Sequence, residues 1–202
     1  MLKLQGIAVS SGVTIGEALV LDSEGFRIPR RFVARSAVDT ELQRLSNAIA
    51  ESTAEIKKNR DAVREELGEQ YAAIFDAHLA MLHDQRLQEE LTSAVRERNW
   101  WPEYAVSRTL RRYAKVFQKL DNHIAQRAHD IYDIEKSLLR NLLGQRRETL
   151  ASISEPVVIL AHNLTPSETA NLDRRFVKGF ATELGGPGSH TAIVAEGLEI
   201  PA

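Results

Sequence analysis

The sequence predicts an α/β subdomain built from both ends of the chain, with an all-helical bundle inserted between those ends. Short apolar and β-branched runs, typical of strands, occur near the two termini of the 202 residues. Between residues 36 and 143, apolar side chains instead recur at helical spacing. We therefore expect residues 1–35 and 145–202 to form one discontinuous subdomain and residues 36–144 to form the other.

Composition narrows the classes of protein to which the chain can belong. The net charge of -2 argues against a nucleic-acid binder, which is usually basic. The chain has no cysteine, so disulfides and thiolate chemistry are excluded. No apolar run approaches the roughly 20 residues of a membrane span, and the N-terminus lacks the features of a signal peptide. We expect a cytoplasmic protein.

Two short strands joined by a turn are expected near the N-terminus. Gly6–Val9 and Gly16–Leu21 are apolar or β-branched, and the turn residues Ser10–Gly12 separate them. Ile28–Val33 should also be extended, since Pro29 disfavours helix in the residue before it.

The middle of the chain should form successive helices, each with one apolar stripe. The first helix follows the capping-like pair Ser36 and Asp39 and breaks at Gly68. The second is expected over Glu69–His83, and Asp84 is a suitable cap for the third.

Two further helices complete the expected bundle. Pro102 suits the first turn of a fourth helix, and a last helix is expected over Asp121–Leu143, ending at Gly144. The spacing Arg127-x-x-Asp130-x-x-Asp133 predicts a salt-bridged face on that last helix. The apolar stripes are expected to form the bundle core rather than cofactor contacts.

Strand signals return near the C-terminus. Pro156–Ala161 is a near-continuous apolar run, which predicts a strand buried on both faces. Thr165, Pro166 and Glu168 have the order of an N-cap, a first-turn proline and a capping-box acid, so a helix should begin there. Phe176–Ala181 predicts another strand, which leads into a glycine-rich loop.

The loop Gly185–Gly188 opens into a short helical run, with Ser189 as N-cap and His190 in the first turn. Glycines let backbone N–H groups approach a ligand closely, and a helix N-terminus attracts anions. Neutral imidazole is a nucleophile, so His190 beside a phosphate cradle indicates covalent phosphoryl transfer. The same residues also fit a plain strand–turn–helix connection with a polar first-turn histidine, and spacing alone leaves both interpretations open.

The residues around this histidine resemble a known signature. Gly185-Gly186-x-x-Ser189-His190-x-Ala192-Ile193-x-Ala195 is similar to the phosphohistidine motif of phosphoenolpyruvate-utilising enzymes. Residues 163–170 and 6–12 resemble enzyme I of the bacterial phosphoenolpyruvate:sugar phosphotransferase system. The resemblance implies the N-terminal domain of an enzyme I, in which an α/β phosphohistidine subdomain carries an inserted helical subdomain.

This resemblance implies a role for each site residue. His190 would take a phosphoryl group from phosphoenolpyruvate and pass it to the phosphocarrier protein HPr. Thr165 matches a family threonine that hydrogen-bonds the active histidine. From the sequence alone, a role as a simple helix cap is an equally good interpretation. Backbone N–H groups of the loop would bind the phosphate, at Gly185, Gly186, Gly188 and Ser189.

The helical subdomain of enzyme I binds HPr, and Phe75-x-x-His78-x-x-x-Leu82-x-Asp84 resembles that subdomain. The resemblance implies a partner-binding surface that contains Glu69, Asp76, His78 and Leu82. Acidic residues there would meet a basic partner, although charges on a helix are otherwise most simply solvated.

Enzyme I continues into a barrel domain that binds phosphoenolpyruvate and Mg²⁺ and supports a homodimer. Nothing in these 202 residues resembles that barrel. We therefore expect no metal ligands in this chain, and phosphate exchange with phospho-HPr rather than direct reaction with phosphoenolpyruvate. Neither nucleic acid nor membrane insertion is expected.

Departures from the family pattern keep other functions open. The family usually has arginine where this chain has Glu196, and different residues where it has Pro187–Gly188. Lys178 and Arg174–Arg175 are candidates for compensating cations. The departures favour a non-catalytic interaction module on a lapsed phosphotransfer scaffold, and the swivelling phosphohistidine domain of a dikinase-like enzyme is a further alternative.

Overall fold

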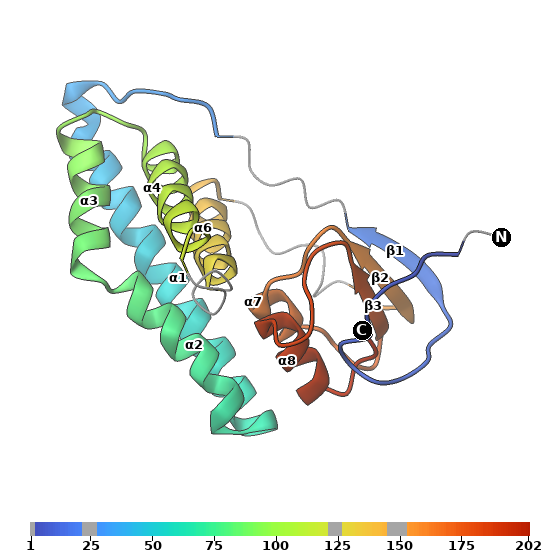
Figure 1. Ribbon diagram of the computed structural model, residues 1–202. Helices are drawn as coiled ribbons and strands as arrows, with labels where there is room; N and C mark the ends of the chain where they lie inside the picture. Colours follow the sequence, from blue (N-terminus) through green and yellow to red (C-terminus); the bar gives the residue numbers. More distant parts are fainter. Residues whose placement is uncertain (1–2, 22–27, 121–126, 145–152) are drawn as a thin grey trace. The chain divides into compact units, whose positions relative to one another are not determined.

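The computed structural model describes residues 3–21, 28–120, 127–144 and 153–202, which form two compact units. Unit 1 contains Met1–Glu24, Val63–Tyr71 and Arg147–Ala202, and unit 2 contains Gly25–Ala62 and Ala72–Arg146. The chain is mostly helical and has one small parallel sheet, in agreement with the predicted fold class (Figure 1). Within the described ranges, no helix has both the length and the apolar composition needed to cross a membrane.

Between β1 (Glu17–Leu21) and β2 (Val157–Ala161), the elements of secondary structure in the described part of the chain are all helices. These helices are α1 (Val38–Leu67, after a 3-10 turn at Arg35–Ala37), α2 (Glu69–Leu82), α3 (Gln85–Arg96), α4 (Pro102–Phe117) and α6 (Ala128–Leu142).

Local sequence signals set most of these helix boundaries. Gly68, with φ 104°, separates α1 from α2 in a conformation that side chains disfavour. The carboxylate of Asp84 caps α3 by accepting from the N–H of Leu87 at 2.9 Å. Pro102 is the first residue of α4, as expected. The predicted start of the last helix falls on residues 121–126, outside the described part of the chain.

The core of unit 2 combines apolar packing with buried ion pairs. The guanidinium of Arg44 in α1 donates to Glu103 of α4 at 2.7 Å and to the carbonyl of Leu142 in α6 at 2.9 Å. One side chain therefore ties three helices together. The largest fully buried apolar side chains are Phe75, Leu82, Leu91, Leu110, Ile134, Leu138 and Leu139.

Unit 1 is organised around a parallel sheet in the order β1 (Glu17–Leu21), β2 (Val157–Ala161) and β3 (Val177–Thr182). α7 (Pro166–Thr169) follows β2 and α8 (His190–Gly197) follows β3, and both lie on the same side of the sheet (Figure 1). The two ends of the chain therefore supply neighbouring strands of one sheet, as the sequence predicts.

The expected strand at Gly6–Val9 is wrong. This segment has no strand assignment, and the N–H groups of Val9 and Ser10 both donate to the carbonyl of Ala202, at 3.0 and 3.2 Å. The N–H of Ala202 also donates to the carbonyl of Ser10 at 3.3 Å, so all of these bonds involve one residue, whereas a strand needs a ladder of successive partners.

The two faces of the sheet differ in burial. Ile159 and Phe180 pair across β2 and β3 and are buried, whereas the adjoining residues Val20 and Leu160, paired across β1 and β2, are 68% and 39% exposed. The prediction that the β2 strand is buried on both faces is therefore wrong. The helices that follow β2 and β3 lie on one side, so the other face of the sheet exposes apolar side chains.

Candidate functional site

The candidate site lies where β2 and β3 end. Parallel strands present their carboxyl ends at one edge of the sheet, which is where open α/β sheets bind ligands. The N–H of Glu183 donates to Ala161 at 3.2 Å, and the N–H of Leu184 donates to His162 at 3.0 Å. These bonds hold the segments that follow the two strands side by side as they lead to α7 and α8.

The glycine loop takes the backbone conformations that its composition predicts. Gly185 and Gly188 have φ values of 122° and 81°, a region that L-residues rarely occupy. The N–H of Ser189 donates to Gly186 at 3.1 Å and closes a tight turn. The Ser189 side chain then accepts from the N–H of Ala192 at 3.2 Å, so it is the N-cap of α8.

His190 is the first residue of α8 and is half-buried. His190 therefore belongs to the first helical turn, whose free N–H groups and helix dipole favour an anion. The hydroxyl of Thr191 donates to the carbonyl of Leu164 at 2.7 Å. This bond joins the start of α8 to the residue directly before Thr165, so the structure brings the segments of these two predicted site residues together.

Thr165 is the buried N-cap of α7. Its Oγ1 accepts from the N–H of Glu168 at 3.2 Å, and the Glu168 carboxylate accepts from the N–H of Thr165 at 3.0 Å. The predicted capping box is thus confirmed. A hydroxyl oxygen has two acceptor positions and one donor hydrogen, so capping α7 leaves Thr165 able to bond a second group.

The charged residues that depart from the family pattern lie away from this edge. Glu196 follows His190 by six residues, which places it about 9 Å along α8 and about 120° around it. Arg174 pairs with Glu199 at 3.0 Å just before β3 begins, and Lys178 is the second residue of β3. These cations belong to the amino end of β3, so the structure does not place them where they would compensate for a missing arginine.

A second exposed ion pair lies at the same amino end. Arg175 hydrogen-bonds Asp173 and lowers the pKa of that carboxyl to about 2. Both residues directly precede β3, so they lie at the amino end of the strand and not at the carboxyl edge that carries the loop.

The predicted partner-binding residues divide into two pairs on α2. Glu69 and Asp76 are seven residues apart, share one face, and have side chains that are 73% and 45% exposed. His78 and Leu82 are four residues apart on another face and are both fully buried. Only the two acids therefore present side chains that a partner can reach.

Both of these acids already have arginine partners. Arg64 donates to Glu69 at 2.6 and 3.0 Å, and Arg60 donates to Asp76 at 3.2 Å. Exposed pairs of this kind contribute little to stability, so a charged partner can compete for them at small cost.

His78 forms a buried charge cluster that the sequence interpretation did not foresee. Its Nε2 lies 3.3 Å from Asp130 and its Nδ1 lies 3.6 Å from Asp133, with all three side chains at most 3% exposed. Burial lowers the pKa of His78, but the close contact with Asp130 and the negative charges of Asp130 and Asp133 outweigh it, so the pKa is raised. The signal was available, because His78 lies four residues from the buried positions Ile74 and Leu82.

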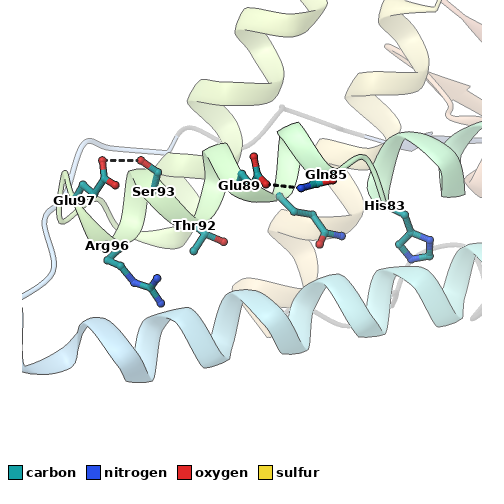
Figure 2. A pocket seen from close by; sticks show the side chains of 8 residues that line it. His83, Gln85, Glu89, Thr92, Ser93, Arg96 and Glu97 are labelled. Atoms are coloured by element: carbon teal, nitrogen blue, oxygen red, sulfur yellow. Dashed lines mark hydrogen bonds between the residues drawn. The ribbon is translucent and has the colours of Figure 1, made fainter.

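A polar groove of about 600 Å³ runs along α3 in unit 2 (Figure 2). Some of its lining side chains hydrogen-bond one another: Gln85 donates to Glu89 at 2.7 Å, and Ser93 donates to Glu97 at 3.0 Å. None of the predicted site residues lines it. The groove is therefore not the candidate site.

Two family models match the chain. Residues 5–127 match the N-terminal model of PEP-utilising enzymes, and residues 153–202 match the mobile-domain model of PEP-utilising enzymes. The second match contains Thr165, the glycine loop and His190.

Curated relatives match along the whole chain. A phosphoenolpyruvate-protein phosphotransferase from Priestia megaterium is 40% identical over 201 residues, which are 99% of this chain and 35% of the relative. One from Geobacillus stearothermophilus is 42% identical over 200 residues, which are 98% of this chain and 34% of the relative. The chain thus spans about a third of the length of these relatives.

Solved structures match the fold as well. An NMR structure of an enzyme I protein, nEIt, has a TM-score of 0.77 at 35% identity and covers 99% of this chain and 81% of that chain. The N-terminal domain of enzyme 1-nitrogen has a TM-score of 0.71 at 24% identity and covers 98% of this chain and 82% of that chain, which supports the fold alone.

Proposed function

Because this chain belongs to the family of PEP-utilising enzymes, we propose that it is the phosphohistidine-bearing part of an enzyme I-like phosphoenolpyruvate-protein phosphotransferase. His190 accepts a phosphoryl group that originates in phosphoenolpyruvate and passes it to HPr. Curated phosphotransferases and an enzyme I structure, matched along nearly the whole chain, bear out the resemblance drawn from the sequence.

The observation that carries the proposal is the hydrogen bond between Thr191 and Leu164, which brings the first turn of α8 to the N-cap of α7. In the exchange with phospho-HPr, the lone pair of one His190 ring nitrogen attacks the phosphorus of the phosphohistidine that HPr carries. The bond between phosphorus and the donor's nitrogen breaks, and that electron pair stays on the donor's imidazole. The second ring nitrogen of His190 keeps its proton and donates it in a hydrogen bond to Oγ1 of Thr165.

The loop provides the electrostatic part of the proposed step. Phosphoryl transfer needs mainly positioning and stabilisation of charge on the phosphoryl oxygens. Backbone N–H groups of Gly185, Gly186 and Gly188 would supply that stabilisation, with the dipole of α8 behind them. The N–H of Ser189, also expected from the sequence to bind phosphate, instead donates to the carbonyl of Gly186 at 3.1 Å. Phosphoenolpyruvate and Mg²⁺ belong to the further domain that the family resemblance implies, so no step at His190 is assigned to a metal.

Transfer of a labelled phosphoryl group from phospho-HPr tests the nucleophile. The chain should take up one phosphoryl group whose label is acid-labile and base-stable, and His190→Ala should abolish the uptake. His162→Ala is the matched control, because His162 is an exposed histidine at the end of β2 that already bonds Glu183 at 2.8 Å. Label retained in His190→Ala, or lost in His162→Ala, would place the chemistry on another residue.

We also propose that HPr docks against the face of α2 that carries Glu69 and Asp76. Complementary charge acts mainly on encounter rate and orientation, so Glu69→Lys and Asp76→Lys should weaken HPr binding in a salt-dependent way. Glu97→Lys changes the same charge at an exposed position on the far end of α3 and should bind like the parent. NMR titration of labelled HPr decides between the variants, and equal binding by all three at low salt would move the docking surface elsewhere.

The labelling experiment also separates the proposal from the non-catalytic interaction module. The position of Glu196, turned away from His190 along α8, removes the main electrostatic objection to phosphorylation. A chain that binds HPr but takes up no phosphate would favour the module. Phosphorylation that requires a nucleotide instead of phospho-HPr would favour a dikinase-like swivelling domain.

A further inference from the structure

Two segments of unit 2 meet where α3 passes into α4. The N–H of Trp101 donates to the carbonyl of Arg31 at 3.1 Å, and Phe32 forms an isolated antiparallel bridge with Trp100. Directly opposed residues of an antiparallel pair have their side chains on the same face, with Cβ atoms about 5 Å apart. Phe32 and Trp100 therefore lie next to each other at the surface.

Each ring in this region has a guanidinium stacked on it. The distance from Cζ to the ring centroid is 5.0 Å for Arg30 over Phe32, 5.0 Å for Arg31 over Trp101 and 5.1 Å for Arg98 over Trp100. We call these six residues the arginine–aromatic corner. All three arginines are exposed, and Phe32 is 60% exposed despite its size.

The three arginines of the corner have no carboxylate partner among the described residues. Arg44 and Arg112, by contrast, each pair with a carboxylate. The chain as a whole carries a net charge of -2, so this local excess of positive charge is not a general property of its surface.

From this arrangement we infer that the arginine–aromatic corner is a docking surface for an acidic segment of a partner protein. Exposed aromatic rings and arginines are the side chains enriched in protein interfaces, and they contribute most of the binding energy there. Guanidinium groups bind carboxylates through two parallel hydrogen bonds. A nucleic acid fits less well, because its phosphates would also meet the net negative charge of the chain.

The stacking also lowers the cost of binding. An arginine normally loses rotamer freedom when it forms a bidentate contact. Arg30 and Arg98 are already held over their rings, and the planar guanidinium still presents N–H donors at its edge. The corner is therefore partly ordered before any partner arrives.

Intrinsic fluorescence reports on this surface directly, because Trp100 and Trp101 are the two tryptophans of the chain. The probe is a 15-residue peptide that repeats Asp-Glu-Leu, and the comparison arms are a Ser-Gln-Leu peptide and a single-stranded oligodeoxythymidine of equal length. Arg30→Gln and Arg98→Gln are the test variants. Arg86→Gln is the matched control, since Arg86 is an exposed arginine near the start of α3.

The acidic peptide should give a saturable change in tryptophan fluorescence, and each test variant should weaken its binding about fivefold at low salt. Arg86→Gln should bind like the parent, and the Ser-Gln-Leu peptide should not bind. The inference is overturned if the acidic peptide gives no saturable change, if Arg86→Gln weakens binding as much as Arg98→Gln, or if the oligonucleotide binds more tightly. Far-UV circular dichroism of each variant verifies that the fold is retained.

Discussion

Removing the imidazole of His78 should be among the most destabilising single substitutions in unit 2. In His78→Leu, two buried carboxylates lose the cation that lies 3.3 Å from Asp130 and 3.6 Å from Asp133. Breaking a buried ion pair by removing one partner costs about 3–5 kcal/mol, because the remaining charge stays desolvated. Two carboxylates share this imidazolium, so we expect His78→Leu to lower the free energy of unfolding by an amount in the upper half of that range. The packing of the leucine side chain offsets part of this loss.

The contribution of His78 to stability should also depend on pH in a definite direction. The pKa of His78 in the folded state is raised above the 6.5 of an unperturbed histidine. The stability that charged His78 contributes is therefore fully present below about pH 6.5 and is lost as the pH rises through the folded-state pKa. The parent should lose stability on this alkaline side, and His78→Leu should not show that component of the loss.

Urea unfolding followed by far-UV circular dichroism, at pH 6 and pH 9, measures both effects. His83→Leu is the control, because His83 lies five residues further on and is exposed, with one bond to Thr53 at 3.2 Å. His83→Leu should lower the free energy of unfolding by less than about 1 kcal/mol. Equal costs for the two variants, or an unchanged pH dependence in His78→Leu, would refute the assignment of a buried imidazolium.

Three other perturbations have clear expectations. Arg44→Ala should lower the free energy of unfolding by about 2 kcal/mol, because the buried carboxylate of Glu103 loses its partner while the 36% exposure of Arg44 screens the pair. Arg64→Ala, at a pair in which both side chains are exposed, should lower it by less than about 1 kcal/mol in the same urea assay. Thr165→Val removes the N-cap of α7, so it should lower the free energy of unfolding by about 1 kcal/mol and slow the phosphorylation of His190. If the rate of labelling is unchanged, Thr165 acts only as a helix cap. Val20→Lys combined with Leu160→Glu should change the free energy of unfolding by less than about 1 kcal/mol in thermal unfolding, since both side chains lie on the exposed sheet face and the two opposite charges are directly paired.

The features that the sequence predicted well depend on interactions between near neighbours. Gly68 ends α1 because its φ of 104° is open to glycine, and Asp84 caps α3 through a residue three positions away. The capping box at Thr165 and the N-cap at Ser189 are equally local. The glycine loop and His190 could be recognised for the same reason, since their geometry is contained within a few residues.

What the sequence could not predict depends on residues far apart in the chain. The spacing in α2 indicates that His78 is buried, but its two acidic partners, Asp130 and Asp133, come from α6 and cannot be predicted from α2. The apolar run of β2 looks the same whether one or both faces of the strand are covered, so the exposure of Leu160 was missed. Likewise, the position of Lys178 near the amino end of β3 follows from the direction of the strand in the sheet, which composition does not reveal.

The pairing of β1 with β2 has a consequence for how the chain folds. Glu17 lies opposite Val157, so this ladder joins residues about 140 positions apart in the sequence. Closing a flexible loop of that length costs roughly 4 kcal/mol of chain entropy, while the helices between the strands need only local contacts. We expect the amides of the helices to become protected first in pulsed hydrogen exchange, and the sheet that leads into the glycine loop to form last. The sheet that carries the candidate site would then form in the slowest step of folding.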